Sequence, residues 1–430
     1  MLAGMLLLAA LATGSTLTPP HTHCVCGGDT DVGDHTTHTD VTYQPWDGTS
    51  AIDYGDDNTA YVCLTDNVTI QSNLEITGGT TLYLCLNSKT FASNGTNKIM
   101  VKENSKLILC DCAGGGTIKG ATKGWGGTGI YLYNSTMDMY GGKITGGYAD
   151  GNGGGGAIAL DDVNCAFNMY GGEISGNKAK SYGGAIFLNG TLQSKKSGIV
   201  NLYGGTISNN HASGYGGAVY LSISSRLTMT DGEICNNTAD EEGGAVHVYG
   251  QNSTFNFSGG TITGNKAVYG GAVYLFREKS TLNLFGGTIK NNTAGSSGGA
   301  VYFNTTSDGK IQGILNISGN PVVKDNTVSG KANNIYLKNG KTLSIVEAMT
   351  DGASLGITTK NTDYPVEFSN AYDTDCTVYF FADDENAHVT ITARKSWSWQ
   401  QARLTPTARQ LHGARMRPTT GMSALQMAAM

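Results

Sequence analysis

Residues 280–303 read STLNLFGGTIKNNTAGSSGGAVYF, and this stretch decides the fold. Leu282 and Leu284 flank Asn283, which is the two-residue alternation of a β-strand with one buried face. No helical period of 3.6 residues runs through the stretch. Its two glycine pairs favour tight corners, because glycine adopts positive φ angles without steric cost. One such unit therefore predicts short strands that are joined by turns.

The unit recurs along the chain. Gly-Gly-Ala appears with its alanine at positions 157, 185, 218, 245, 272 and 300. A second motif, Gly-Gly-x-Ile with one Asp-Gly-Glu-Ile variant, places isoleucine at positions 118, 144, 174, 207, 234, 262 and 289. Two unrelated markers share intervals of 26 to 33 residues, which indicates a true repeat.

Strand parity assigns a direction to each repeated position. In the strand that follows Gly-Gly-Ala, apolar residues at the first and third positions, such as Val273 and Leu275, are predicted to face inward. The position between them is predicted to face outward. From its second occurrence on, it holds Phe187, Tyr220, His247, Tyr274 and Tyr302.

These features predict an all-β fold, a parallel β-helix in which each unit of about 27 residues forms one rung of three short strands. Roughly nine or ten rungs are expected over residues 60–346. Solenoids need covered ends, because an open rung exposes unpaired backbone groups. Residues 347–393 lose the repeat but keep β-type runs, so we interpret them as a C-terminal β cap or small β unit.

Asparagine follows the isoleucine of the second motif by three residues in five units. We expect these side chains in a buried or half-buried turn, where stacked amides hydrogen-bond from rung to rung. The predicted structural ladder consists of Asn177, Asn210, Asn237, Asn265 and Asn292.

The two ends differ in style from the repeat. Residues 1–12 form an apolar stretch that is too short to span a membrane, so residues 1–20 are interpreted as a signal peptide, with a short buried helix as the alternative. The basic leader is missing, which suggests a truncated start. Residues 394–430 hold six basic residues and no acid, and we interpret them as a disordered or non-native tail rather than a membrane-binding one.

Charge argues against nucleic-acid binding. The net charge is −6, and without the six basic residues of the tail, 22 basic residues remain against 34 acidic ones, or −12 for residues 1–393. We expect no transmembrane span.

A segment rich in histidine and cysteine precedes the repeat, and residues 21–59 are interpreted as a flexible linker. Imidazole and thiolate groups suit Zn²⁺, although the spacing is not that of a zinc finger. No other cofactor is expected. The candidate metal ligands are His21, His23, Cys24, Cys26, His35 and His38.

Cys85 and Cys110 occupy equivalent places in adjacent units. A Cα separation near the strand spacing of ~4.8 Å falls within the range that a disulfide tolerates. The alternatives are a disulfide and two surface thiols.

Gly-Gly-Ala-Ile/Val coupled to Ile-x-x-Asn, over about residues 115–303, resembles the polymorphic outer membrane protein repeat, in which phenylalanine often replaces this isoleucine. The flanking stretches Cys85-Leu86-Asn87, 332–337 and 351–354 are similar to secreted β-helix proteins of gut bacteria. The resemblance implies a right-handed parallel β-helix in an extracellular or cell-surface protein of adhesin type. Expected partners are glycans or host or bacterial surface proteins, and we expect a monomer.

Three functions compete. An adhesin could use the outward rings to stack on sugars or on a partner, unless loops cover the rings or they only pack against each other. A polysaccharide lyase or hydrolase of the pectate-lyase-like class would need paired carboxylates or a basic residue with calcium, for which Arg226, Arg277, Asp161-Asp162 and Asp240-Glu241-Glu242 are thin support. A structural stalk is the third option. We expect a binding protein and no enzyme, because near-uniform rungs show no break for a catalytic site.

Overall fold

The computed structural model describes residues 21–26, 38–151, 153–161, 164–190, 198–304, 313–337, 342–359, 366–367, 369–370, 377–393 and 400–406. The predicted signal peptide and most of the predicted tail lie outside them. In the part described, the chain consists of β-strands and one 3₁₀ turn, η1 (Thr377–Tyr379). None of the helices described here is long and apolar enough to cross a bilayer.

Three long ladders, parallel except for the first strand pair of the first ladder, wind around one axis. The first ladder joins equivalent strands of successive rungs, and Leu282 of one rung lies opposite Phe255 and Leu315 of its neighbours. Its strands are β1 (His21–Cys26), β2 (His38–Trp46), β3 (Thr59–Leu64), β6 (Thr81–Cys85), β9 (Lys106–Cys110), β12 (Thr136–Met139), β16 (Ala166–Met169), β20 (Ile199–Leu202), β24 (Arg226–Met229), β28 (Thr254–Phe257), β32 (Thr281–Leu284), β36 (Ile314–Gly319), β41 (Leu343–Met349) and β44 (Ser369–Asn370).

The second ladder carries the isoleucine of the Gly-Gly-x-Ile motif. Its strands are β4 (Val68–Thr69), β7 (Thr90–Ala92), β10 (Thr117–Lys119), β13 (Lys143–Thr145), β17 (Glu173–Ser175), β21 (Thr206–Ser208), β25 (Glu233–Cys235), β29 (Thr261–Thr263), β33 (Thr288–Lys290) and β37 (Val322–Lys324).

The third ladder follows the Gly-Gly-Ala motif. Its strands are β5 (Leu74–Ile76), β8 (Ile99–Lys102), β11 (Ile130–Tyr133), β15 (Ile158–Asp161), β19 (Ile186–Asn189), β23 (Val219–Leu221), β27 (Val246–Val248), β31 (Val273–Leu275), β35 (Val301–Phe303), β40 (Ile335–Leu337), β42 (Ser354–Thr359) and β45 (Phe380–Ala382). Strand β42 also pairs with β37, so it joins the second and third ladders at the C-terminal end.

A narrow fourth sheet fills the corner between the second and third ladders. Its strands are β14 (Tyr148–Ala149), β18 (Lys178–Ala179), β22 (His211–Ala212), β26 (Thr238–Ala239), β30 (Lys266–Tyr269), β34 (Thr293–Ser297), β38 (Thr327–Val328) and β39 (Lys331–Ala332).

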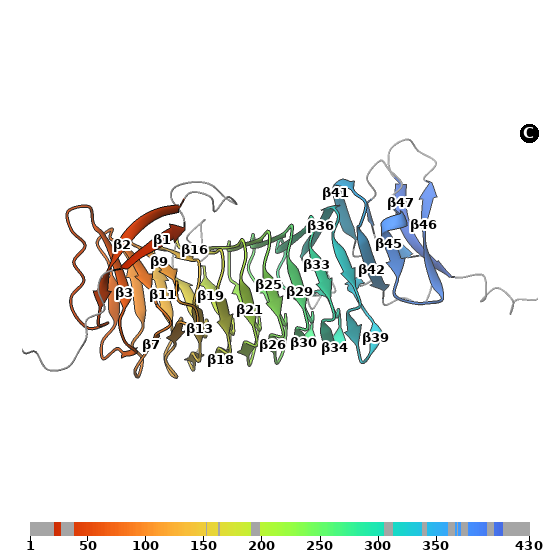
Figure 1. Cartoon of the computed structure of the whole chain (residues 1–430). Coiled ribbons are helices and arrows are strands. Elements are labelled where there is room, and N and C mark those ends of the chain that lie inside the picture. Colours follow the sequence, from red (N-terminus) through yellow and green to blue (C-terminus); the bar gives the residue numbers. More distant parts are fainter. Residues whose placement is uncertain are drawn as a thin grey trace, which may run out of the picture.

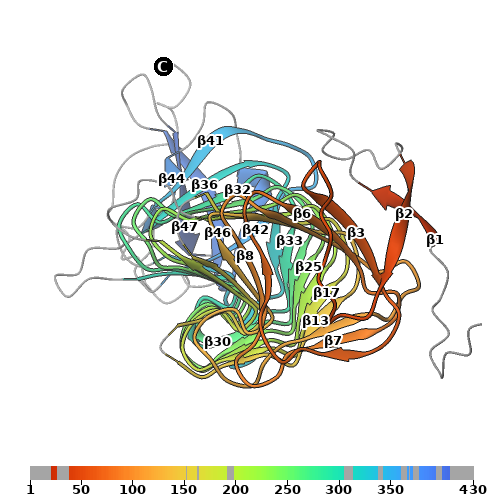
Figure 2. The ribbon, with the colours of Figure 1, turned by 90° about the vertical axis from the view of Figure 1, so that its left-hand side faces the viewer.

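The parallel β-helix predicted from the sequence is confirmed. Figure 1 shows the rungs stacked along one axis, with the colour running steadily along the stack, and the end-on view of Figure 2 shows the strands superposed in columns. Ten strands of the first ladder, from β3 to β36, belong to rungs that also hold strands of the second and third ladders. The predicted count of roughly nine or ten rungs agrees with this.

The core lies inside the three ladders. Leu227, Ile234 and Val246 each come from a different ladder of the same rung, and all three side chains are fully buried. Full burial of one such side chain contributes about 1.5–3 kcal/mol. Because like residues stack from rung to rung, the core is a continuous apolar column and not a set of separate clusters.

A column of asparagines lines the corner between the second ladder and the fourth sheet. Asn210 is representative: its Nδ2 and its backbone N both donate to Oδ1 of Asn237, at 2.9 and 3.0 Å. The residue before the column has a positive φ, as at Asn209 and Asn236, which explains why glycine or asparagine precedes it. The buried members named from the sequence are Asn177, Asn210, Asn237, Asn265 and Asn292. Asn326 and Asn334 extend the column, and Asp383 ends it.

The N-terminal segment differs from the predicted flexible linker over 21–59. Strand β2 pairs antiparallel with β1 and parallel with β3. Tyr43 and Trp46 of β2 are buried, and Trp46 stacks on Phe91 of the core at 6.1 Å between ring centroids. The segment has too few apolar residues to show a strand periodicity. Its two buried aromatic side chains nevertheless pack it against the first rungs.

The C-terminal end carries a small antiparallel sheet of β43 (Val366–Glu367), β47 (Gln400–Pro406) and β46 (Ala387–Ala393). Strand β47 lies within residues 394–430, so this part of the predicted disordered tail is paired with β46 in the structure.

Candidate binding groove

The outward-facing side chains of the third ladder form a continuous stack of rings, which we name the ring column. Its members lie opposite one another in register through β19, β23, β27, β31 and β35. The ring centroids of Tyr220 and His247 are 5.2 Å apart with an interplanar angle of 4°, and those of His247 and Tyr274 are 5.1 Å apart with an angle of 10°. Offset stacking of this kind is a favourable aromatic geometry. The column comprises Phe187, Tyr220, His247, Tyr274 and Tyr302.

The ring column points away from the core, as strand parity predicts, but the exposed stripe that an adhesin would use is not what the structure shows. Only 6% of Phe187, 5% of Tyr220, 3% of Tyr274 and 1% of His247 is exposed. Parity gives the direction of a side chain and not what lies above it. Both alternatives raised from the sequence hold here, because the rings pack on each other and neighbouring segments cover them.

A second column, the cover column, lies over one side of the rings. Its residues stand directly before each Gly-Gly-Ala motif and pair through isolated parallel bridges. The ring of Tyr182 lies 4.7 Å from that of Tyr220, and the ring of Tyr215 lies 5.2 Å from that of His247. The cover column comprises Tyr182, Tyr215, Glu242 and Tyr269.

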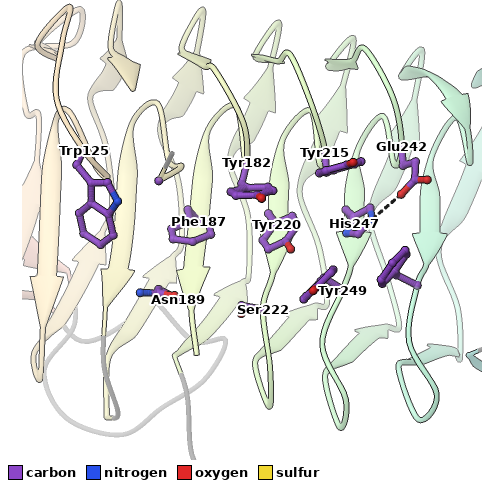
Figure 3. Close-up of a pocket in the computed structure, with 12 residues that line it drawn as sticks. Trp125, Tyr182, Phe187, Asn189, Tyr215, Tyr220, Ser222, Glu242, His247 and Tyr249 are labelled. Carbon is purple, nitrogen blue, oxygen red and sulfur yellow. Dashed lines mark hydrogen bonds and ion pairs between the residues drawn. The ribbon is translucent and has the colours of Figure 1, made fainter. Parts of the chain in front are cut away.

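A third column flanks the rings on the other side, two residues after each ring position. Tyr249 and Phe276 stack at 5.0 Å with an interplanar angle of 12°. Asn189 and Ser222 occupy the equivalent positions in the preceding two rungs and supply polar groups. Figure 3 shows the three columns as parallel rows that run along the solenoid axis.

Together the three columns line a groove with a volume of about 480 Å³. This volume lies within the range of ~300–1,000 Å³ that is typical of small-molecule sites. Tyr182, Tyr215 and Tyr249 form its walls, and three members of the ring column, Phe187, Tyr220 and His247, form its floor (Figure 3). The groove is therefore lined mostly by aromatic side chains, and their hydroxyl groups together with Asn189, Ser222, Glu242 and His247 make much of its surface polar.

Trp125 stands at one end of the groove and is 47% exposed. Its position is fixed by the backbone, because Lys98 Nζ donates to the carbonyl oxygens of Trp125 and Gly126 at 3.1 and 2.9 Å. A Cβ on Gly153 would lie 2.5 Å from Nε1 of the indole, so only glycine leaves room for this ring. Trp125 is thus an exposed but anchored platform.

Arg277 stands near the other end. Its guanidinium lies 5.0 Å from the ring centroid of Tyr249, and Nη2 donates to the Tyr249 hydroxyl at 2.7 Å. Stacking on an aromatic face is favourable for arginine and leaves its remaining donors available.

Among the described lining residues, His247 and Glu242 form a contact between two ionisable side chains. Nε2 of His247 lies 3.1 Å from a carboxylate oxygen of Glu242. Burial lowers the pKa of His247 despite the nearby carboxylate, so the imidazole is neutral at pH 7 and Nε2–H is the donor. Burial, followed by the charge of Glu242, raises the pKa of Tyr274. Nδ1 of His247 has no hydrogen-bond partner among the described residues.

The described lining of the groove does not contain the paired carboxylates of a glycosidase. Glu242 is the sole carboxylate among the described residues that line it, whereas a glycosidase uses two. Arg226 lies in the first ladder and Arg277 follows the third, so the two arginines do not share a site. Nor do the remaining acids converge: Asp161 accepts from Tyr131 Oη and Asn189 Nδ2, and Asp240 contacts His211. Asp162 lies outside the described residues.

The predicted metal ligands fall largely outside what the structure describes. Strand β1 contains His21, His23, Cys24 and Cys26, and pairing with β2 places Cys26 opposite His38 in the backbone register. The side chains of these residues, and His35 altogether, lie outside the described part. Among the residues that are described, no group of three or more metal-ligating side chains converges. Zinc binding by this segment stays a prediction.

Cys85 and Cys110 lie opposite one another in β6 and β9. No disulfide joins them, and Cys85 is fully buried, so it is not the surface thiol of the alternative.

The cover column was missed in the sequence although a signal for it exists. Tyr-Gly-Gly-Ala occurs at Tyr182, Tyr215 and Tyr269, so a tyrosine precedes the motif in three of its six occurrences. This offset of five residues before each ring would have indicated a second aromatic row. Trp125 directly precedes Gly126-Gly127 in the same way, although no alanine follows that glycine pair, so the sequence carries a signal for this aromatic residue as well.

Comparison with known families gives a match to a repeat within the solenoid. Residues 204–222 match the Chlamydia polymorphic membrane protein repeat, so the chain carries a repeat of the polymorphic outer membrane protein type. The matched segment covers β21, β22 and β23 and contributes Tyr215, Tyr220 and Ser222 to the groove. No curated protein and no solved structure matches the chain significantly.

Proposed function

We propose that the protein is a secreted, surface-exposed binding protein of adhesin type, and that the groove of the third ladder holds a glycan. The observation that carries the proposal is the continuous aromatic lining over at least four rungs, from Tyr182 to Phe276. The repeat of polymorphic membrane protein type supports a location at the cell surface.

Glycan fits the chemistry of the lining. Sugar rings present apolar C–H faces that stack on aromatic side chains, and hydroxyl groups that need hydrogen-bond partners. Tyr215 and Tyr249 offer faces and hydroxyls, while Asn189 and Ser222 offer amide and hydroxyl groups at the groove edge. The groove runs along the solenoid axis, so a linear chain of several sugar units matches it better than one compact ligand (Figure 3).

The groove also favours binding over turnover. A second carboxylate is missing from the described lining, and Glu242 is engaged by His247. We therefore propose a ligand that is held and not cleaved.

A glycan array with the full chain tests the proposal. Replacing Tyr182 and Tyr215 together by alanine removes wall and keeps the buried ring column, so we expect at least a tenfold loss of affinity for any glycan that binds. The matched control is Tyr170→Ala with Tyr203→Ala, a stacked pair of half-buried tyrosines at 4.9 Å on another face.

The control should bind like the unchanged protein. If the Tyr182/Tyr215 variant bound the glycan as tightly as the control variant, the groove would not be the glycan-binding site. Cleavage of a bound pectic or host glycan, detected by release of reducing ends, would show that the protein is an enzyme.

A further inference from the structure

Four cysteines of the first three rungs gather on the outer face of the first ladder. Cys63, Cys85 and Cys110 lie opposite one another in β3, β6 and β9. Cys112 follows β9 by two residues. Tyr43 of β2 lies on the same cluster, with its hydroxyl 3.7 Å from Sγ of Cys110. Strand β2 therefore covers a row of sulfur atoms and not an ordinary apolar patch.

Cys85 is the central sulfur of this row. Its Sγ lies 2.9 Å from Sγ of Cys112. Hydrogen bonds from Cys110 and Cys63 outweigh the effect of burial and hold the pKa of Cys85 below its usual range. The other sulfur atoms therefore converge on Sγ of Cys85 and leave no central position for a metal ion. This agrees with the lack of a converging metal-ligand group among the described residues.

We propose that Cys85 and Cys112 form a disulfide when the protein reaches an oxidising compartment, with a thiol–disulfide oxidoreductase or a small-molecule disulfide as the oxidant. The bond closes a loop between residues that are 27 positions apart, which is one turn of the solenoid. It would link the second and third rungs covalently at the N-terminal end of the solenoid, where β2 packs.

The geometry favours Cys112 over Cys110 as the partner. Cys110 Sγ also hydrogen-bonds Cys85, but it contacts the carbonyl oxygen of Leu84 at 3.7 Å and the Tyr43 hydroxyl as well, and it is less exposed than Cys112. Cys112 is exposed, so an oxidant in solution can reach it, whereas Cys85 is fully buried and cannot be approached. The reaction needs one sulfur that the oxidant can reach and a second sulfur close enough to attack it, and Cys112 and Cys85 meet these two requirements.

The chemistry follows ordinary thiol–disulfide exchange. Cys112 loses its proton and attacks the oxidant R–S–S–R, forming Cys112–S–S–R and releasing RS⁻, which takes up that proton. The Cys85 thiolate then attacks Sγ of Cys112 and releases the second RS⁻, which takes up the proton that Cys85 gave up. Two thiols lose two electrons and two protons, and the oxidant becomes two R–SH.

Peptide mapping distinguishes the possible pairings. The full chain is incubated with oxidised glutathione, unreacted thiols are alkylated, and the protein is digested without reductant by an endoproteinase that cleaves before aspartate together with trypsin. Cleavage before Asp111 separates Cys110 from Cys112, and cleavage after Lys89 and before Asp66 isolates Cys85. We expect a linked pair of fragments, 66–89 and 111–119.

Two variants sharpen the test. Cys112→Ser should abolish the link and lower the midpoint of thermal unfolding by several degrees, whereas Cys110→Ser should retain both. A link between fragments 66–89 and 107–110 would overturn the proposed pairing. Complete alkylation of Cys85 and Cys112 in the unfolded, oxidised sample would show that this disulfide does not form.

Discussion

Asp383 decides how the asparagine column ends. Its carboxylate accepts from the backbone N and from Nδ2 of Asn334, both at 2.6 Å, and from the hydroxyl of Thr358. Asp383→Ala leaves these buried donors without an acceptor and should cost about 1–3 kcal/mol of unfolding free energy. Asp383→Asn keeps an acceptor oxygen, so it should preserve the column. Urea unfolding of both variants measures the difference.

The same residue gives a pH dependence with a defined sign. Burial raises the pKa of Asp383 above its usual value of 3.8. Its contribution to stability is therefore present below that value and is lost as pH rises through the folded-state pKa. Asp383→Asn cannot ionise, so the variant should gain stability relative to the unchanged protein between pH 4 and pH 7. An unchanged difference across this range would show that Asp383 is not desolvated.

At the scale of the element, the two glycines of Gly-Gly-Ala have different structural roles. The first adopts a positive φ, 68° at Gly243, which forms the corner. The second, Gly244, has no such angle, but a Cβ there would meet the carbonyl oxygen of Gly271 in the next rung and the backbone N of Lys266. The motif is therefore a turn signal followed by a contact point between rungs.

Substitution of Gly244 tests the second role, the close contact between rungs, without changing the corner at Gly243. Gly244→Ala forces neighbouring rungs apart and should cost about 1–3 kcal/mol or more, as overpacking does. Gly295→Ala is the matched control, because its φ is not positive and the nearest atom to an added Cβ is 3.6 Å away. Thermal unfolding of the pair checks this, and equal midpoints would contradict the role given to Gly244.

Strand parity made the elements predictable but not their surroundings. Leu282 and Leu284 face inward because period-two alternation is a property of the strand itself. Phe187 and Tyr220 face outward for the same reason, yet Tyr182 covers them through a contact that crosses from one column to another. Likewise Tyr43 of β2 packs on Tyr61 of β3, a long-range contact that no local pattern encodes. Sequence periodicity thus predicts the direction of side chains within one rung. Whether a side chain is covered depends on the packing of several rungs.

At the scale of the whole molecule, each rung contacts chiefly its two neighbours, so stability is a sum of rungs and the contacts between them. Equivalent residues occupy equivalent places: Tyr220, His247 and Tyr274 follow one another in one column, and Asn210, Asn237 and Asn265 in another. One rung should therefore be removable without disturbing the path of the others.

Deletion of residues 226–253 tests this, since it joins Ser225 to Thr254 and removes the rung of β24 to β27. The columns then close with Tyr220 beside Tyr274 and Asn210 beside Asn265, so the shortened chain should fold cooperatively and be shorter by one strand spacing, ~4.8 Å, in small-angle scattering. It also loses His247 and Glu242, so glycan binding should weaken while the fold persists. Deletion of residues 226–239 is the control, because half a rung sets the ladders out of register and should prevent folding. Equal behaviour of the two deletions would contradict a solenoid assembled from interchangeable rungs.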